Sequence, residues 1–249
     1  MTFPFMLDFF GHPVHPHPVL EGLGYFAGAR LYFALRKRHP ESAHPLETTL
    51  WLIFGALLGA FLGSKVLAWV ESPSDYFGKG DWHVLLGGKT IVGALLGGWA
   101  GVEVAKKFND VTSSTGDLFV YPLALGNAIG RVGCFLTGLS DKTYGVATKL
   151  PWGVDFGDGI YRHPTQLYES IFVLSWATIL WLYNWRRPLP PGALFRLYLG
   201  GYFAWRFLVE FIKPRELLVP AFDLSAIQVA SLIGVGIAGW SFWKLRRTV

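Results

Sequence analysis

Two arginines, Arg131 and Arg206, lie inside apolar stretches that are long enough to cross a membrane. An arginine near the centre of a bilayer costs about 2.5–3.5 kcal/mol on insertion scales, and more in simulations of isolated helices. A chain retains such a charge where a carboxylate partner or an anionic ligand meets it. The glycines at 126, 130 and 133 reduce the side-chain bulk around Arg131, so a ligand can approach closely. These residues predict an anion site within a membrane protein.

Further ionisable and polar side chains lie in or beside the apolar stretches and could complete this site. They are Tyr25, Lys65, Lys89, Arg162, His163, Gln166, Tyr168, Glu169, Tyr202 and Glu210. Arg206 and Glu210 are four residues apart, so on a helix they share one face. In lipid, that face is expected to point into the helix bundle.

The buried candidates carry more positive than negative charge. The cations are Lys65, Lys89, Arg131 and Arg206, and the carboxylates are Glu169 and Glu210. Mutual neutralisation would pair Glu210 with Arg206 and Glu169 with Arg131. That pairing leaves two cations unmatched, which a low dielectric penalises strongly. An anionic ligand would remove the imbalance. In a membrane the candidate is a phospholipid phosphate, which arginine holds with a bidentate fork.

The composition indicates a membrane protein rather than a soluble one. Of 249 residues, 52% are hydrophobic and 16% are charged, and the mean hydropathy is positive at +0.36. Soluble domains carry about 25% charged residues. The net charge of +5 does not indicate a nucleic-acid partner, because the basic residues cluster at the ends of apolar runs. The single cysteine excludes an internal disulfide.

Seven apolar runs are each long enough to span a bilayer, which takes about 20 residues. We place them near 18–35, 49–70, 84–105, 117–138, 166–185, 193–213 and 225–243. The sequence therefore predicts an all-α polytopic protein with seven transmembrane helices, forming a single membrane domain over residues 1–249. The start of the chain, residues 1–18, is apolar but too short to span. It is expected either to lie in the membrane interface or to be disordered.

Basic residues in the connections predict the orientation of these spans. One set of connections holds Arg36, Lys37, Arg38, Lys106, Lys107, Arg186, Arg187, Lys244, Arg246 and Arg247. The opposite set holds Lys79, Lys142, Lys149, Arg162 and Arg215. The first set should be cytoplasmic, which places the N-terminus outside and the C-terminus in the cytoplasm. The polar segment 139–165, between spans four and five, is then expected to form a small periplasmic cap.

Metal and thiol chemistry have weaker support in the sequence. Cys134 lies among apolar residues, where a small buried side chain is commoner than a nucleophile. His12, His15 and His17 alternate with prolines and could bind a metal, but no carboxylate or second cluster supports this. We assign no metal ligands and expect no cofactor.

Three motifs follow one another along the chain. Residues 130–135 read Gly-Arg-Val-Gly-Cys-Phe, residues 162–169 read Arg-His-Pro-Thr-Gln-Leu-Tyr-Glu, and Tyr-Phe-Ala-Trp-Arg at 202–206 is followed by Val-Glu-Phe at 209–211. From about Tyr25 to Lys213 the chain resembles the prolipoprotein diacylglyceryl transferase family of bacterial inner-membrane enzymes. The second motif is similar to the family's string at every position.

The resemblance implies a multi-pass protein of the bacterial cytoplasmic (inner) membrane and a reaction for it. The family moves the diacylglyceryl group of phosphatidylglycerol onto a prolipoprotein cysteine thiol and releases glycerol phosphate. By resemblance, Arg131 and Arg206 hold the lipid phosphate and stabilise the charge that grows on it. Tyr202 and residues 162–169 would orient the substrate or the cap. Tyr25 and Lys65 fall where the family has a first-span tyrosine and a second-span basic residue.

The chain departs from the family where the acceptor would be activated. The family's third-span Ser-Phe-His-Gly-Gly reads Thr-Ile-Val-Gly-Ala at 90–94, so Val92 replaces the histidine proposed to assist the thiol. Cys134 replaces the signature asparagine, and Leu139 stands at the expected glutamate, with Asp141 as a displaced substitute. Lys89 adds a cation where the family tends to be apolar.

Three functional hypotheses remain open on these residues. The first is a phosphatidylglycerol-dependent transferase that acts on a prolipoprotein thiol, or a paralogue that acts on another acceptor. The second is a non-catalytic phospholipid-binding or lipid-translocating membrane protein that kept the headgroup site. A solute transporter is the third and weakest, because the internal repeats of many such proteins are not visible.

Overall fold

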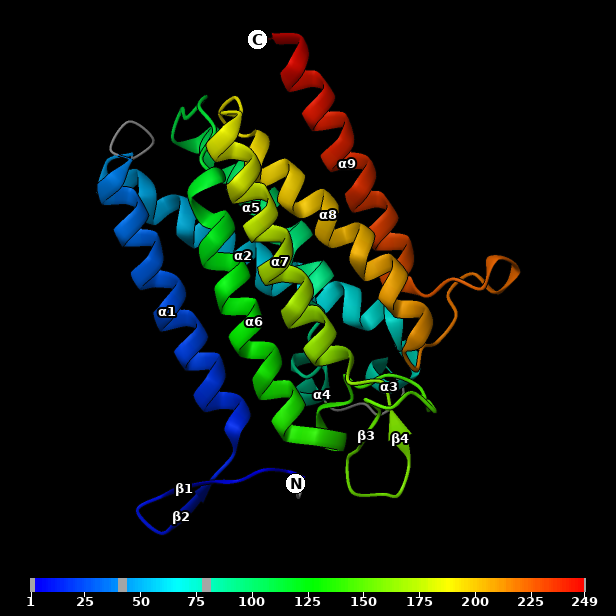
Figure 1. Cartoon of the computed structure of the whole chain (residues 1–249). Coiled ribbons are helices and arrows are strands. Elements are labelled where there is room, and N and C mark those ends of the chain that lie inside the picture. The colour runs from blue at the N-terminus through cyan, green and yellow to red at the C-terminus, as the bar shows by residue number, and fades with distance from the viewer. Residues whose placement is uncertain (1–2, 40–43, 78–81, 249) are drawn as a thin grey trace. The chain divides into compact units, whose positions relative to one another are not determined.

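The computed structural model describes residues 3–39, 44–77 and 82–248, and helices dominate it (Figure 1). The long helices within these ranges are α1 (Pro16–Arg38), α2 (Leu46–Glu71), α5 (Ile91–Phe108), α6 (Val120–Thr137), α7 (Thr165–Arg186), α8 (Ala193–Val209) and α9 (Ala226–Thr248). The short ones are α3 (Pro73–Phe77), α4 (Trp82–Leu86), η2 (Asp117–Phe119), η3 (Gly138–Asp141), η4 (Glu210–Ile212) and η5 (Pro220–Phe222). Each predicted span overlaps one long helix, so the all-helical class is confirmed.

Three helical segments of the described chain are long and apolar enough to cross a membrane, by length and composition. They are Leu46–Glu71, Asp117–Asp141 and Ala226–Arg247. Much of the apolar surface of α2 is exposed, as at Trp51, Phe54, Leu57 and Phe61. Such a surface is stable in contact with lipid tails and unfavourable in water.

The predicted third span is wrong at its start. The chain forms the short helix α4 and then an irregular stretch, and the helix that carries this span begins at Ile91 instead of near residue 84. Gly88 has a φ of +56°, a left-handed conformation that ends a helix and that glycine adopts without strain. The backbone carbonyls freed at this break face Lys65 of α2, as described below.

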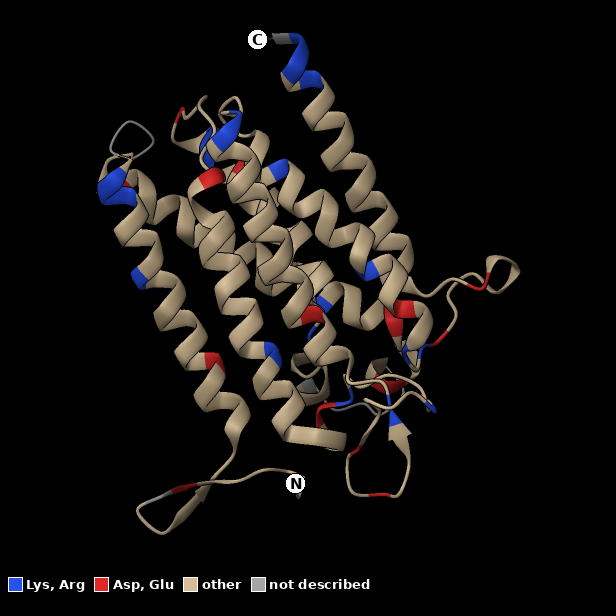
Figure 2. Ribbon diagram, viewed as in Figure 1, with Lys and Arg blue, Asp and Glu red and all other residues tan. Residues whose placement is uncertain are grey.

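The chain forms two compact units. Unit 1 comprises 1–41, 116–198 and 211–214, and unit 2 comprises 42–115, 199–210 and 215–249. In unit 1, α6 packs against both α1 and α7, which run in the same direction (Figure 1). Figure 2 shows basic residues at the C-terminal ends of these two helices, among them Arg38 and Arg186. Lys79, one of the residues counted for the orientation, lies outside the described residues.

In unit 2, α2 and α5 meet through glycines on both helices. The glycines recur at every fourth position, at Gly55, Gly59 and Gly63 of α2 and at Gly93, Gly97 and Gly101 of α5. A Cβ atom added to Gly59 would lie 2.2 Å from the carbonyl oxygen of Gly97, and the reverse substitution meets Gly59 at the same distance. Small residues that let two backbones approach in this way are typical of membrane helix interfaces. Helix α9 packs against the same two helices.

The predicted cap, residues 139–165, contains a small hairpin in unit 1. Strands β3 (Val154–Asp155) and β4 (Tyr161–Arg162) pair antiparallel, with Val154 opposite Arg162. The turn between them is held by one atom, Oδ1 of Asp155, which accepts hydrogen bonds from the backbone N–H groups of residues 157, 158 and 159. This Asx-type turn explains the Asp-Phe-Gly-Asp-Gly sequence.

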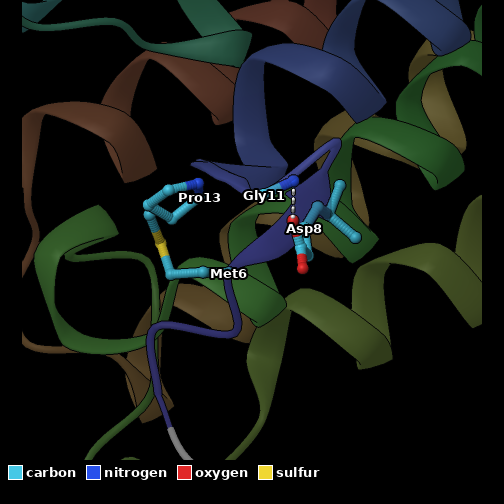
Figure 3. A pocket seen from close by; sticks show the side chains of 5 residues that line it. Met6, Asp8, Gly11 and Pro13 are labelled. Atoms are coloured by element: carbon cyan, nitrogen blue, oxygen red, sulfur yellow. Dashed lines mark hydrogen bonds between the residues drawn. The ribbon is translucent and has the colours of Figure 1, made fainter.

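The described N-terminal residues form a hairpin of strands β1 (Leu7–Phe9) and β2 (His12–Val14), so the disordered alternative for them is wrong. Their place in the membrane interface stays a prediction. Phe10 and Gly11 both have positive φ, at 52° and 80°, as a type I′ turn requires. Figure 3 shows a shallow pocket lined by Met6, Leu7, Asp8, Gly11 and Pro13, in which the Asp8 carboxylate accepts the Gly11 N–H at 2.8 Å. This contact fixes the turn.

Candidate functional site

Arg131 and Glu169 form an ion pair between α6 and α7 in unit 1. Arg131 Nη2 lies 3.0 Å from Glu169 Oε1, and Glu169 is only 2% exposed. The next residue, Ser170, donates a hydrogen bond to the carbonyl of Ala128 at 3.1 Å, which ties the two helices together beside the pair. The carboxylate therefore orients a guanidinium whose side chain keeps 13% of its surface exposed. Charge-assisted contacts of this kind are stronger than neutral hydrogen bonds and fix the geometry of the guanidinium.

Gln166 lies three residues before Glu169, on the same face of α7. It is 1% exposed, and neither its amide nitrogen nor its amide oxygen makes a hydrogen bond to any described residue. Leaving a buried polar group unsatisfied costs about 1–3 kcal/mol. Native structures seldom contain such a group without an ordered water or a ligand to meet it. The Gln166 amide therefore indicates a bound polar partner beside the Arg131–Glu169 pair.

Arg162 organises the cap rather than the helix pair. Its Nη1 and Nη2 atoms bind Oδ1 and Oδ2 of Asp158, each at 2.7 Å, in a bidentate fork. The guanidinium also lies over the ring of Tyr144, 5.1 Å from its centroid. The Arg162 guanidinium holds the pKa of the Asp158 carboxyl below its usual range, chiefly through these hydrogen bonds.

His163 and Tyr168 contact each other where the cap enters α7. His163 Nδ1 lies 3.2 Å from the Tyr168 hydroxyl, and Trp152 Nε1 donates a hydrogen bond to the same hydroxyl at 2.7 Å. Tyr25 of α1 is 69% exposed and donates a hydrogen bond from its hydroxyl to Glu21 at 2.7 Å. Unit 1 thus brings together most members of the 162–169 string.

Unit 2 contains the second predicted arginine. Arg206 Nη2 lies 2.8 Å from Glu210 Oε2, and both side chains are buried. Tyr202, one helical turn before Arg206, is fully buried. The spacing of four residues predicted that Arg206 and Glu210 share a face, and the ion pair confirms it.

The two predicted lysines lie in different settings, Lys65 against backbone carbonyls and Lys89 outside the helix of its span. The Lys65 ammonium donates hydrogen bonds to the carbonyls of Gly87 and Gly88 at 2.8 Å each, and to that of Leu86. These three acceptors match the three N–H donors of a lysine. Lys65 therefore holds the break before α5 in place. Lys89 is exposed just before α5 begins, so its expected burial is wrong, because the helix of this span starts only after it.

The buried charges are neutralised within the protein more completely than the sequence predicted. Both carboxylates form the pairs of the neutralising alternative, Glu169 with Arg131 and Glu210 with Arg206. Carbonyl dipoles compensate Lys65, a contribution that a count of charged residues cannot include. The buried Gln166 amide then becomes the stronger indication of a ligand, and its unmatched atoms gave no signal in the sequence.

Comparison with known proteins agrees with these motifs. The family model of prolipoprotein diacylglyceryl transferase matches residues 4–244. A phosphatidylglycerol–prolipoprotein diacylglyceryl transferase of Mannheimia succiniciproducens is 34% identical over 211 residues, which cover 78% of this chain and 75% of the relative. The relative of the same name from Clostridium tetani is 32% identical, covering 84% and 85%. That of Aliivibrio fischeri is 31% identical, covering 92% and 84%.

Proposed function

This chain belongs to the prolipoprotein diacylglyceryl transferase family, and we propose that it moves the diacylglyceryl group of phosphatidylglycerol onto the thiol of a prolipoprotein cysteine. In this step the sulfur bonds to the glyceryl carbon, and the bond from that carbon to the phosphate oxygen breaks. Glycerol phosphate leaves, and the thiol proton passes to a base or to water. Negative charge grows on the phosphate as the bond breaks, so fixed cations around it lower the barrier.

The Arg131–Glu169 pair with the buried Gln166 amide is the observation that carries this proposal. Arg131 is oriented by a buried carboxylate between α6 and α7, where a phosphate oxygen gains most from a charge-assisted hydrogen bond. The unmatched Gln166 amide lies on the same helix face and offers two further donors. Together they suit a phosphate that enters from the membrane.

The family resemblance assigns a phosphate-binding role to Arg206 as well. Its guanidinium is oriented by Glu210, and Tyr202 is packed one turn before it. Remaining contacts to the substrate or to the cap are assigned to Tyr25, Lys89, Arg162, His163, Tyr168 and Glu169. The Lys65 ammonium instead donates to the carbonyls before α5. No metal or cofactor enters this reaction scheme.

We further propose that the chain crosses the bacterial inner membrane seven times, with its N-terminus outside and its C-terminus in the cytoplasm. The seven long helices of the described chain and the basic C-terminal ends of α1, α5, α7 and α9 support this topology. Reporter fusions test it. A reporter active only in the periplasm should respond after residue 150 and stay silent at the C-terminus.

The chain lacks the histidine that the family resemblance places in the third span to assist the thiol. The identity of the acceptor depends on which group replaces this base. Val92, which is fully buried in α5, has a hydrocarbon side chain, so the position where the family resemblance places a histidine has no group that can accept a proton. This observation favours the second candidate, a non-catalytic phospholipid-binding or lipid-translocating protein, or a paralogue with another acceptor. If a thiol is the acceptor, Val92→His should raise the rate.

The test uses the purified full chain with labelled phosphatidylglycerol and a peptide that carries the acceptor cysteine. We expect lipidated peptide and glycerol phosphate in equal amounts. Arg131→Ala and Arg206→Ala should each lower the rate by about 10²–10³, as loss of one transition-state stabiliser does. Arg30→Ala, at an exposed arginine of α1, is the matched control and should keep full activity. Tight lipid binding without glycerol phosphate release, with thiol and hydroxyl peptides alike, would overturn the transferase.

A further inference from the structure

Three metal-ligating side chains from three elements of unit 1 converge at one point. His17 lies in the first turn of α1, Cys134 near the end of α6, and Asp141 at the end of η3. Their nitrogen, sulfur and oxygen atoms all lie within 4.8 Å of one another. Cys134 is buried, and His17 Nδ1 is buried without a hydrogen bond to any described residue. The mechanism proposed above uses none of the three.

The spacing of these atoms suits a metal ion better than a direct hydrogen bond. His17 Nδ1 lies 3.5 Å from Asp141 Oδ1, beyond the distances of ordinary protein hydrogen bonds. In a tetrahedral zinc site with bonds of about 2.0–2.3 Å, neighbouring ligand atoms are roughly 3.3–3.7 Å apart. The separation of His17 Nδ1 and Asp141 Oδ1 falls within this range, and the Cys134 sulfur lies within 4.8 Å of both atoms. The buried Cys134 thiol completes the cluster from α6.

Neighbouring carboxylate and hydroxyl groups contact two of the candidate ligands, His17 and Asp141. His17 Nε2, on the other side of the ring, lies 3.5 Å from Glu21 Oε2, and the Tyr25 hydroxyl donates to the same carboxylate. The Thr143 hydroxyl donates to the second oxygen of Asp141. Metal-ligating histidines usually place their other nitrogen against a carboxylate, which fixes the tautomer and the ring orientation. His17 has this arrangement.

We propose that His17, Cys134 and Asp141 bind a divalent transition metal of the zinc type. On binding, the cation displaces the proton of the Cys134 thiol into solvent, so the ligands are one thiolate, one carboxylate and one neutral imidazole. Their two negative charges balance the ion, which limits the cost of placing it beside Arg131. A mixed S, N, O donor set excludes Mg²⁺ and Ca²⁺, which select oxygen ligands. Three protein ligands leave a fourth position for water or another donor.

The test is the absorption spectrum of the full chain loaded with Co²⁺, which occupies zinc sites and reports their geometry. Cys134 is the only cysteine in the sequence, so a sulfur-to-cobalt charge-transfer band can arise from no other residue. We expect this band, together with the visible bands of tetrahedral cobalt, at one ion per chain. Zn²⁺ should displace the cobalt and abolish both. The protein should carry an affinity tag without histidine.

Matched variants separate the cluster from the neighbouring histidines. Cys134→Ser should abolish the charge-transfer band, and His17→Gln or Asp141→Asn should weaken cobalt binding strongly. Glu21→Gln, which alters only the support of His17, should weaken it by about 10–100-fold. His12→Gln and His15→Gln, in the same His-Pro segment, should leave the spectrum unchanged. Each variant is compared by circular dichroism and gel filtration, so that a loss of fold is recognised.

Two results would overturn the metal site. One is a folded wild-type protein that shows no sulfur-to-cobalt band at saturating Co²⁺. The other is a band that His12→Gln weakens as much as His17→Gln does. Neither result bears on the transferase, because the measurement contains no lipid and no acceptor. Conversely, an inactive protein that binds one cobalt ion through Cys134 supports this inference while contradicting the proposed function.

Discussion

Two helix interfaces in this molecule bring their helices together by opposite means, one through glycines and the other through polar side chains. In unit 2, α2 and α5 meet backbone to backbone through glycines, as at Gly59 and Gly97. In unit 1, α6 and α7 meet through polar side chains, with Ser170 bonded to the Ala128 carbonyl and Arg131 paired with Glu169. The glycines of the first interface carry no group that could react. The second interface contains charge that a membrane tolerates only in a pair or with a ligand.

The difference shows which interface sets the fold and which provides the chemistry. Lipid tails are as apolar as leucine, so helices in a membrane gain little from hydrophobic burial and associate through close contact. The α2–α5 interface obtains that contact by removing side chains. The α6–α7 interface instead holds a guanidinium in an ion pair and a serine bonded to a backbone carbonyl. Substitutions that act on one interface should therefore have a different signature from those on the other.

The largest effect is expected at the glycine interface. A leucine at Gly59 would place its side chain where the Gly97 backbone now lies, and neither backbone can move without separating the helices. We expect Gly59→Leu to cost more than about 4–5 kcal/mol, the range reached only by exceptional substitutions. The yield of monodisperse protein and its thermal unfolding measure this. Gly236→Leu, at an exposed glycine of α9 with open space around it, is the control and should fold normally.

A smaller loss of stability is expected at the polar interface. Glu169→Ala leaves the largely buried Arg131 guanidinium without its carboxylate, which should cost about 3–5 kcal/mol of unfolding free energy. The double variant Arg131→Ala with Glu169→Ala removes both charges. It should be less destabilised than the sum of the two single variants. Additive losses in denaturant unfolding would mean that the two side chains do not act as a pair.

At Gln166 we expect stability and substrate binding to change in opposite directions. Gln166→Leu removes a buried amide that no described residue satisfies, so the unliganded protein should be unchanged or more stable by about 1–3 kcal/mol. If the amide binds the lipid headgroup, the KM for phosphatidylglycerol should rise at the same time. Thermal unfolding and steady-state kinetics on one sample give both values. A fall in stability with an unchanged KM would make Gln166 a structural residue only.

The smallest effect concerns pH and lies in the cap. The folded-state pKa of Asp158 is lowered by its hydrogen bonds to Arg162, so their contribution to stability is present above the unfolded pKa of about 3.9. It is lost as the pH falls through the folded pKa. We expect the acid-side decline in thermal stability to be shallower in Asp158→Asn than in the wild type. Asp110→Asn, at an exposed aspartate after α5, should leave the decline unchanged.

The sequence predicted the seven helices because apolar length is a local property that no tertiary contact alters. It also predicted that Arg206 and Glu210 share a face, since their spacing fixes this within one helix. The start of the third span could not be predicted, because it depends on how Lys65 meets carbonyls far along the chain. The N-terminal hairpin was missed because Phe10 adopts a left-handed conformation that phenylalanine rarely takes.

At the candidate site, the sequence indicated the two arginine–glutamate pairs but not the full charge balance. Counting charged side chains overlooks backbone carbonyls, so Lys65 was expected to need an anion. The unmatched Gln166 amide has no counterpart in a residue pattern. The glycine interface was not predicted either, although glycine recurs at every fourth position in two separate spans. That repeat is the signal of two helices in close contact.

Lys65 also bears on the order in which the chain assembles. Its ammonium holds the carbonyls of residues 86–88, so the irregular stretch before α5 is shaped by a side chain of α2. Synthesis runs from the N-terminus, and α2 therefore leaves the ribosome before the carbonyls that it will hold. In the proposed topology, the lysine enters the membrane with α2, before its acceptors are synthesised. The stretch before α5 would then take its final shape by binding a lysine of α2 that is already in place.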